Sequence, residues 1–334
     1  ESFNINSTSL LFSQNKDPII FRSLKNIIYN NHIALKNSKF LSSKGINTTV
    51  IMDDKLPFTL VCGSLNGSLK VSKNVQNFQN IKSFNFSKKP ISHLVKINRD
   101  TVLFNSLDKN IIIFNLKEER ISLKFNLRKI ISSIKLCHHA PYRMLIGTSI
   151  GSIFEIDIKQ GKIMTNYSNH LGCITSLEFL NDSQFFLSTS KDNTFRIWRS
   201  GMPFQFKKIG RSLAGYVINS YSLKDHPLIA YQCSDDKILL IYILKNKDIK
   251  MKKVLQGHSL NKIPCSLACS TKSNIILSGD YLGILHFWRW NIHSKPFLSS
   301  RVHRKACIST ITISNTNVII TSSWDGFVKM WTYT

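Results

Sequence analysis

A histidine, two serines, an aspartate and a tryptophan occur close together in the middle of the sequence. His170 comes first, and Ser188 and Ser190 follow it. Asp192 and Trp198 complete the group, six residues apart. Ser, His and Asp side chains in one place are the parts of a nucleophilic hydrolase site. The same residue types also form buried hydrogen-bonded clusters, in which each polar group satisfies the others.

Repetition of the group favours the structural interpretation. His303, Asp325 and Trp331 repeat it near the end of the sequence, and His258 precedes Trp288 in a similar way. Structural contacts recur from one repeat to the next, whereas a single active site does not. Neither Ser188 nor Ser190 stands in the G-x-S-x-G elbow that presents a hydrolase serine. We therefore predict hydrogen-bonded tetrads that fasten loops to strands, no catalytic residue, and a protein that is not an enzyme.

Motifs for metals and nucleotides are also missing from the sequence. It contains no C-x-x-C, H-E-x-x-H or G-x-x-x-x-G-K-[ST] pattern. Cys137, His138 and His139 have the right atoms for a metal, but no second ligand pair stands at zinc spacing. The seven scattered cysteines favour buried free thiols in a reducing compartment. We expect no metal, no cofactor and no small-molecule substrate.

The motif that ends on tryptophan belongs to a repeat. Its clearest copies are "STSKDNTFRIW" (188–198), "LSGDYLGILHFW" (277–288) and "SSWDGFVKMW" (322–331). Aligned on the tryptophan, seven copies end at residues 72, 114, 157, 198, 242, 288 and 331. The spacings of 41 to 46 residues are those of WD-type propeller blades. Alternating apolar runs predict strands, and the D-G, D-N and N-G pairs predict hairpin turns between them.

The repeats predict an all-β fold, a seven-bladed WD40 β-propeller. One four-stranded blade cannot bury both of its faces, so blades stack around an axis and ring closure protects the edges. The last copy ends at Trp331, and we expect the outer strand of that blade within about residues 32–41. The propeller then spans residues 32–334. Residues 1–31 are expected to be an N-terminal extension that packs on the ring or leaves it.

The charge of the chain is strongly positive. Its 334 residues contain 45 Lys and Arg against 19 Asp and Glu, a formal net charge of +26. Such an excess favours a polyanionic neighbour, of which nucleic acid is the usual one. A very AT-rich coding sequence would produce the same excess of lysine without any selected contact, and both explanations stay open. No run of about 18 apolar residues occurs, so no membrane partner is expected.

Loops of one propeller face are the expected contact surface. The turn before each aspartate and the loop that carries each histidine emerge on the same face. Trp324 stands out because Trp331 already fills the structural position of its blade, and an exposed tryptophan suits an interface. The candidate interface residues are Lys191, Tyr281, Trp324, Arg304 and Lys305. The candidate phosphate contacts are Lys207, Lys208 and Arg211.

The amino-acid sequences of the later repeats resemble those of a known protein family. The stretches concerned are "DIKQGKIMTNYSNHLGCITSLEFLNDSQFFLSTSKDNTFRIW" (157–198), "YQCSDDKILLIY" (231–242), "LSGDYLGILHFWRW" (277–290), "HRKACI" (303–308) and "SSWDGFVKMW". In order and spacing they resemble the pre-mRNA-processing factor seventeen family, WD-repeat splicing factors also called cell-division-cycle proteins. The resemblance covers about residues 145–331, and the first three blades agree mainly in period.

This resemblance implies a nuclear, non-enzymatic scaffold of the catalytic spliceosome that supports exon ligation, the second step of splicing. It implies contacts with the large U5 scaffold protein and neighbouring spliceosomal proteins. Contacts with snRNA or the pre-mRNA backbone are a further expectation. Family members carry a long charged extension before the propeller, whereas about forty residues precede the first blade here. The alternative is a WD40 adaptor that selects substrates or peptides for a ubiquitin ligase or a chromatin complex.

Overall fold

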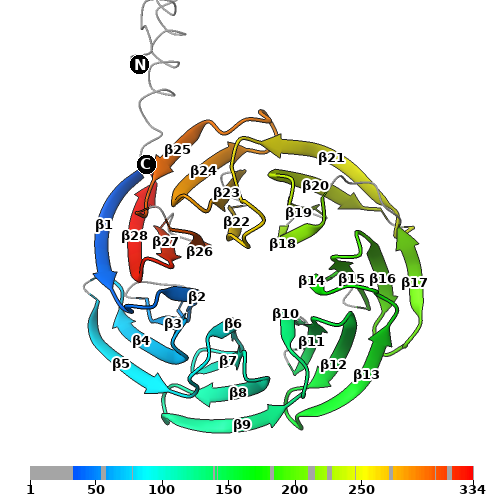
Figure 1. Ribbon diagram of the computed structural model, residues 1–334, viewed down its shortest axis with the longest axis horizontal. Coiled ribbons are helices and arrows are strands. Elements are labelled where there is room, and N and C mark those ends of the chain that lie inside the picture. Colours follow the sequence, from blue (N-terminus) through cyan, green and yellow to red (C-terminus); the bar gives the residue numbers. More distant parts are fainter. Residues whose placement is uncertain are drawn as a thin grey trace, which may run out of the picture.

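The computed structural model describes residues 33–53, 58–76, 78–137, 140, 142–180, 184–209, 215–223, 228–244, 246–270, 274–304, 306–313 and 318–333. Within these residues the chain forms 28 β-strands and no helix. The strands make seven four-stranded antiparallel sheets, which stand as blades around a central axis (Figure 1). The predicted seven-bladed β-propeller is therefore confirmed. Among the described residues no helical segment capable of crossing a bilayer is found.

The strands of the first four blades follow the chain from the axis outward. Blade one contains β2 (Ile46–Ile51), β3 (Leu60–Ser64), β4 (Ser68–Asn74) and β5 (Gln79–Asn85). Blade two contains β6 (Ile91–Lys96), β7 (Thr101–Ser106), β8 (Asn110–Asn115) and β9 (Arg120–Asn126). Blade three contains β10 (Ile131–Leu136), β11 (Arg143–Thr148), β12 (Ser152–Asp157) and β13 (Lys162–Ser168). Blade four contains β14 (Ile174–Phe179), β15 (Phe185–Ser190), β16 (Phe195–Arg199) and β17 (Gln205–Ile209).

The last three blades continue in the same order. Blade five contains β18 (Val217–Leu223), β19 (Leu228–Cys233), β20 (Lys237–Ile243) and β21 (Ile249–Gln256). Blade six contains β22 (Leu267–Ser270), β23 (Ile275–Gly279), β24 (Ile284–Arg289) and β25 (Leu298–Arg301). Blade seven contains β26 (Ile308–Ile313), β27 (Val318–Ser323) and β28 (Phe327–Tyr333), and its outer strand is β1 (Ile33–Phe40).

Strand β1 closes the ring. It pairs antiparallel with β28, from Ile33 opposite Tyr333 to Phe40 opposite Phe327. It lies in the stretch where the sequence predicts this outer strand, about residues 32–41. Because β1 covers the edge of β28, the first and last parts of the propeller hold each other. The extension expected at residues 1–31 lies outside the described residues.

A residue with positive φ fixes the register of each blade. It sits in the turn between the second and third strands, five residues before a buried or nearly buried position on the third strand. In blades three and five that position is Ile156 and Ile241. The sequence alignment, which placed Asp157 and Tyr242 there, is wrong by one residue, because the turn sets the register and not the final aromatic or polar residue. The turn residues are Gly67, Lys109, Gly151, Asn193, Asp236, Gly283 and Gly326.

Hydrogen bonds tie the innermost strands to one another around the axis. In every blade except the sixth, the register of the innermost strand shifts after its first residue. At this shift Ser132 Oγ donates to the Ile174 carbonyl of the next blade at 2.6 Å. Ser309 Oγ donates to the Ile46 carbonyl at 2.6 Å, which joins blade seven to blade one. Each such bond stabilises the ring by about 1 kcal/mol.

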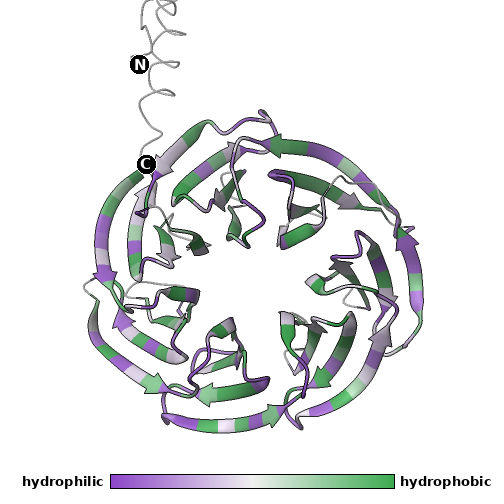
Figure 2. Ribbon diagram, in the orientation of Figure 1, coloured by the Kyte–Doolittle hydropathy of each residue, from purple (hydrophilic) through white to green (hydrophobic). Residues whose placement is uncertain are grey.

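The apolar core lies between neighbouring blades. Trp198 of blade four is fully buried and packs against Tyr167 of blade three, with ring centroids 5.4 Å apart. It also stacks on Phe186 of its own blade at 6.2 Å. Burying a large aromatic side chain contributes roughly 2–3 kcal/mol relative to leaving it in water. Figure 2 shows apolar residues concentrated on the inner and middle strands, whereas polar and apolar residues alternate along the outer strands.

Candidate functional site

The predicted tetrad residues of blade four meet in one buried network. His170 lies in the loop between β13 and β14, and its Nε2 is 2.7 Å from Ser188 Oγ. Trp198 Nε1 donates to the same Oγ at 2.8 Å. His170 Nδ1 is 2.8 Å from Asp192 Oδ2, which also accepts the Leu171 amide at 3.0 Å. The network therefore fastens the loop that enters the blade to its second and third strands.

In this geometry Ser188 is not placed to act as a nucleophile. Its hydroxyl is fully buried and already holds the indole N–H of Trp198. The Ser190 hydroxyl does not contact His170; it donates to the Gly172 carbonyl at 2.9 Å and accepts the Asp192 amide at 3.1 Å. A hydrolytic serine must reach a substrate carbonyl, whereas the buried hydroxyl of Ser188 contacts only protein groups. The Ser, His and Asp of blade four are thus arranged as a structural tie.

Electrostatics reinforce the tie. Burial by itself would raise the pKa of Asp192, but hydrogen bonds from Thr194 and His170 outweigh it and lower this pKa to about 2. Burial also lowers the pKa of His170, against the pull of Asp192. At neutral pH the carboxylate is therefore ionised and accepts hydrogen bonds from the loop.

Blade seven repeats the network with one substitution. His303 Nδ1 is 2.9 Å from Asp325 Oδ2, and its Nε2 is 2.9 Å from Thr321 Oγ1. Trp331 Nε1 donates to Thr321 Oγ1 at 2.9 Å. Thr321 was missed from the sequence because only serine was considered for the hydroxyl position. The signal is its spacing, since Thr321 precedes Trp331 by ten residues, as Ser188 precedes Trp198.

Blade six does not form the predicted network, so the tetrad assignment of His258 and Trp288 is wrong. Trp288 Nε1 donates to the Gln256 carbonyl at 3.1 Å instead. Neither ring nitrogen of buried His258 has a hydrogen-bond partner among the described residues. Leu282 occupies the position of Asp192, six residues before the tryptophan. Asp280 stands two residues too early and accepts backbone N–H groups of its own turn.

His258 is instead held by ring packing. Its imidazole meets the Trp288 indole nearly edge-on, with centroids 5.5 Å apart. Burial, followed by the neighbouring His286, lowers the pKa of His258 to about 4. At neutral pH this histidine is therefore uncharged. An uncharged, buried imidazole acts here as an aromatic side chain in the core.

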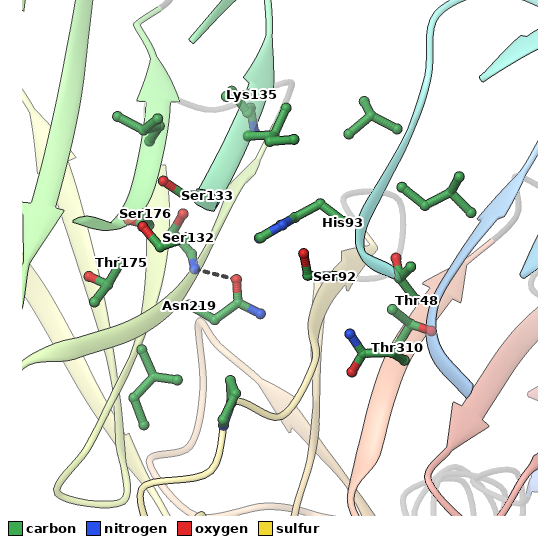
Figure 3. Close-up of a pocket in the computed structure, with 18 of the residues that line it drawn as sticks. Thr48, Ser92, His93, Ser132, Ser133, Lys135, Thr175, Ser176, Asn219 and Thr310 are labelled. Carbon is green, nitrogen blue, oxygen red and sulfur yellow. Dashed lines mark hydrogen bonds between the residues drawn. The ribbon is translucent and has the colours of Figure 1, made fainter. Parts of the chain in front are cut away.

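A polar cavity of about 440 Å³ occupies the centre of the ring. Figure 3 shows Ser92 and His93 of blade two, Ser132 of blade three and Asn219 of blade five around it. The wall also carries the charged side chains of Lys135 and Glu178, and Glu178 is almost fully buried. Glu178 pairs with Lys135 Nζ of blade three at 2.6 Å and accepts the Ser220 hydroxyl of blade five at 2.8 Å.

The charged and polar groups of the cavity wall hold neighbouring blades together. Glu178 joins three consecutive blades, and a buried carboxylate with such partners is a structural clamp. Across the described residues, no three His, Cys, Asp or Glu side chains are grouped so that they could hold a metal ion. The polar side chains around the cavity therefore link neighbouring blades through hydrogen bonds along its wall.

The candidate interface residues that the structure describes lie on turns and loops of the face that carries the tetrads. Trp324 is 38% exposed, and its Nε1 donates to Asn47 Oδ1 at 3.3 Å, beside the central cavity. Lys191 is exposed and its Nζ lies over the Tyr216 ring, 5.5 Å from the centroid. Tyr281 is half-buried and Arg304 is exposed. Lys305 lies outside the described residues.

The candidate phosphate contacts differ from one another. Lys207 forms an ion pair with Asp248 of the next blade, so its charge is already partnered. Lys208, its neighbour on β17, is exposed. Arg211 lies outside the described residues. Of the two that the structure describes, Lys207 is half-buried and Lys208 is the more exposed.

Fold and ties together define a class of protein. A seven-bladed β-propeller with His–Asp and Trp–hydroxyl ties is a WD40-repeat propeller, and the family "WD domain, G-beta repeat" matches residues 161–199 and 295–332. These segments contain the third strands and tryptophans of blades four and seven, whose networks are the complete ones.

Three of the curated relatives that the chain matches share the name Pre-mRNA-processing factor 17. The chain is 29% identical over 186 residues to Pre-mRNA-processing factor 17 of Homo sapiens, covering 55% of this chain and 32% of that protein. The same figures hold for Pre-mRNA-processing factor 17 of Mus musculus. The Saccharomyces cerevisiae protein of that name is 26% identical over 241 residues, covering 70% of this chain and 52% of that protein. The family resemblance drawn from the sequence is thus confirmed. The chain spans about a third of the mammalian relatives and about half of the yeast one.

Proposed function

We propose that the chain is a non-catalytic scaffold of the catalytic spliceosome that supports exon ligation. The observation that carries this proposal is its similarity to Pre-mRNA-processing factor 17 from three organisms. The relatives' name connects them to the processing of pre-mRNA. On this proposal the chain works in the nucleus and binds spliceosomal proteins, including the large U5 scaffold protein.

The site geometry supports a binding role. The Ser188 hydroxyl of the most hydrolase-like group is fully buried, and blade seven repeats the same arrangement with Thr321. A propeller held by such repeated ties offers rigid rims and loop-bearing faces to its partners. We therefore assign the chain a role in holding other components in place.

RNA contact is a smaller part of the proposal. Exposed Lys or Arg residues occur on the outer strands of all seven blades and are not concentrated on one of them. Such an even distribution favours the compositional explanation of the positive charge over one selected RNA-binding face. Representatives, one on each outer strand, are Lys36, Lys82, Lys124, Lys162, Lys208, Lys250 and Arg301.

Affinity capture tests the proposed function. The tagged chain, expressed in its own cells, is recovered from nuclear extract, and the bound RNA and proteins are sequenced. We expect spliceosomal snRNAs together with the large U5 protein. Recovery of a cullin adaptor or of histones without snRNAs would contradict the proposal and favour the adaptor alternative. Repeating the capture at increasing salt separates RNA contacts, which weaken steeply, from apolar protein contacts.

A further inference from the structure

Four large aliphatic side chains are exposed on one part of the tetrad-bearing face. Leu107 and Ile150 lie in the turns of blades two and three, and they are 40% and 61% exposed. Ile130 and Leu171 lie in the loops that enter blades three and four, and they are 45% and 93% exposed. A cluster of exposed apolar residues on one side of a soluble domain marks an interaction site.

Backbone hydrogen bonds show that these four residues lie in one continuous band. The Leu127 amide donates to the Lys109 carbonyl at 3.3 Å, which joins the turn of blade two to the next loop. The Ser149 amide donates to the Ile130 carbonyl at 3.0 Å, which joins that loop to the turn of blade three. Gly151 in that turn lies against the loop of blade four, since a Cβ on Gly151 would stand 2.3 Å from the His170 carbonyl oxygen.

The band ends at the turn of blade four, where the Lys191 amide donates to the Cys173 carbonyl at 2.9 Å. We call this surface the aliphatic arc and define it by four apolar and four basic residues. The apolar residues are Leu107, Ile130, Ile150 and Leu171, and the basic residues are Lys109, Arg128, Lys129 and Lys191.

Charge on the arc is positive. Lys109, Arg128 and Lys191 are exposed, and Lys129 lies with its Nζ 4.8 Å from the Phe154 ring centroid. The two carboxylates of these turns are held by hydrogen bonds, and Asp108 is half-buried. Asp108 accepts hydrogen bonds from Ser106 and from the Asn110 amide, and Asp192 belongs to the blade-four tie. The arc therefore presents aliphatic groups among four basic residues, against two carboxylates in the same turns.

We propose that the aliphatic arc binds an acidic peptide segment that carries apolar side chains. Cations attract and orient an acidic segment, while the aliphatic groups bury its Leu, Ile or Phe side chains. Single-stranded RNA would need aromatic platforms for its bases, and the four exposed apolar residues of the arc are all aliphatic. A second copy of this chain would bring the same positive charge to the contact.

This inference deepens the proposed function, because it takes the propeller to be a binding module and names the chemistry of one partner. It also places the contact on blades two to four, away from the predicted interface at Trp324 and Arg304 of blade seven. Its test uses only the purified chain and no spliceosomal component. A failed capture from nuclear extract would contradict the spliceosomal role while leaving the result for the arc intact.

The experiment selects a displayed library of random 12-residue peptides on the purified chain. Selected peptides are then measured by fluorescence anisotropy against the wild type and the double variant Ile150→Asp/Leu171→Asp. We expect peptides that combine Asp or Glu with Leu, Ile or Phe, and at least tenfold weaker binding to the double variant. Both replaced side chains are exposed, so thermal unfolding of the variant should stay close to the wild type.

Ile292→Asp is the matched control. Ile292 is 54% exposed in the connection between β24 and β25, on the opposite face of the ring, and its replacement should leave the peptide affinity unchanged. A 12-nucleotide oligouridylate serves as the second probe. The proposal is overturned if no selected peptide distinguishes the double variant from the wild type, or if the arc-dependent peptides lack acidic residues. Oligouridylate binding that requires the arc would also overturn it.

Discussion

Blades four and six have the same four-stranded sheet and the same buried tryptophan, yet they hold their entering loops differently. In blade four His170 bridges Ser188 and Asp192. In blade six, His258 has ring contacts but no side-chain hydrogen bond among the described residues, and Leu282 stands where the aspartate would be. The comparison separates two contributions to a blade. Aromatic burial is common to both, whereas the polar tie depends on one carboxylate at one turn position.

Removal of the shared aromatic core should have the largest effect. Trp198→Ala leaves a cavity between blades three and four, and we expect a loss of about 3–5 kcal/mol in the free energy of unfolding. Trp288→Ala in blade six should cost a similar amount, because its indole is equally buried. Urea denaturation followed by circular dichroism measures both. A loss below about 1 kcal/mol for either tryptophan would contradict the role given to aromatic burial.

Acid should act on blade six through His258. Its pKa is lowered to about 4 in the folded chain by burial, so between pH 6.5 and 4 the unfolded chain binds a proton that the folded chain does not. The stabilisation from neutral His258 is therefore complete above pH 6.5 and declines as the pH falls toward 4. We expect a loss on the order of 3 kcal/mol from this group.

The variant His258→Gln isolates this contribution. Urea denaturation at pH 7 and pH 4.5 should show a smaller pH dependence in the variant than in the wild type. An unchanged pH dependence would mean that other groups cause the acid sensitivity.

Loss of the carboxylate should affect blade four alone. Asp192→Ala removes a partly buried acceptor from His170 and the Leu171 amide, and we expect a loss of about 1–3 kcal/mol. Because the pKa of Asp192 is lowered to about 2, its contribution is present above pH 4 and is lost as the pH falls through 2. Leu282→Ala at the matching position of blade six should cost less than Asp192→Ala at pH 7. Equal losses in thermal unfolding would remove the distinction between the two blades.

The smallest effect on stability is expected at Trp324, which shares a residue type with Trp198 but not its surroundings. Trp324→Ala removes one long hydrogen bond to Asn47 and a partly exposed ring, so unfolding should change by less than about 1 kcal/mol. If Trp324 belongs to an interface, the same variant weakens recovery of partners in affinity capture. A large drop in melting temperature would instead mark Trp324 as a structural residue.

The fold could be predicted because each repeat carries the sequence signals of a blade independently of the others. The period, the turn residues and the terminal tryptophans gave seven blades without long-range information. The register in blades three and five could not be found from the last residue alone, because Asp157 and Tyr242 resemble the expected ending. The positive-φ residue that fixes the register, Gly151 or Asp236, is identified as such only by its backbone geometry.

The ties were predictable only where both partners keep their spacing. His258 precedes a tryptophan as His170 does, but Asp280 stands eight residues before Trp288, where the tie requires six. The exposed aliphatic arc could not be predicted from the sequence. Ile150 and Leu171 come from different repeats, and only ring assembly places their turn and loop together.

A double-mutant cycle on His170 and Asp192 tests the central claim, that this pair is a structural tie, most directly. The free energy of unfolding is measured for the wild type, His170→Ala, Asp192→Ala and the double variant, and the same cycle is run on His258 and Leu282. We predict a coupling energy of about 1–3 kcal/mol in blade four and less than about 0.5 kcal/mol in blade six. No coupling in blade four, or equal coupling in both blades, would contradict the account.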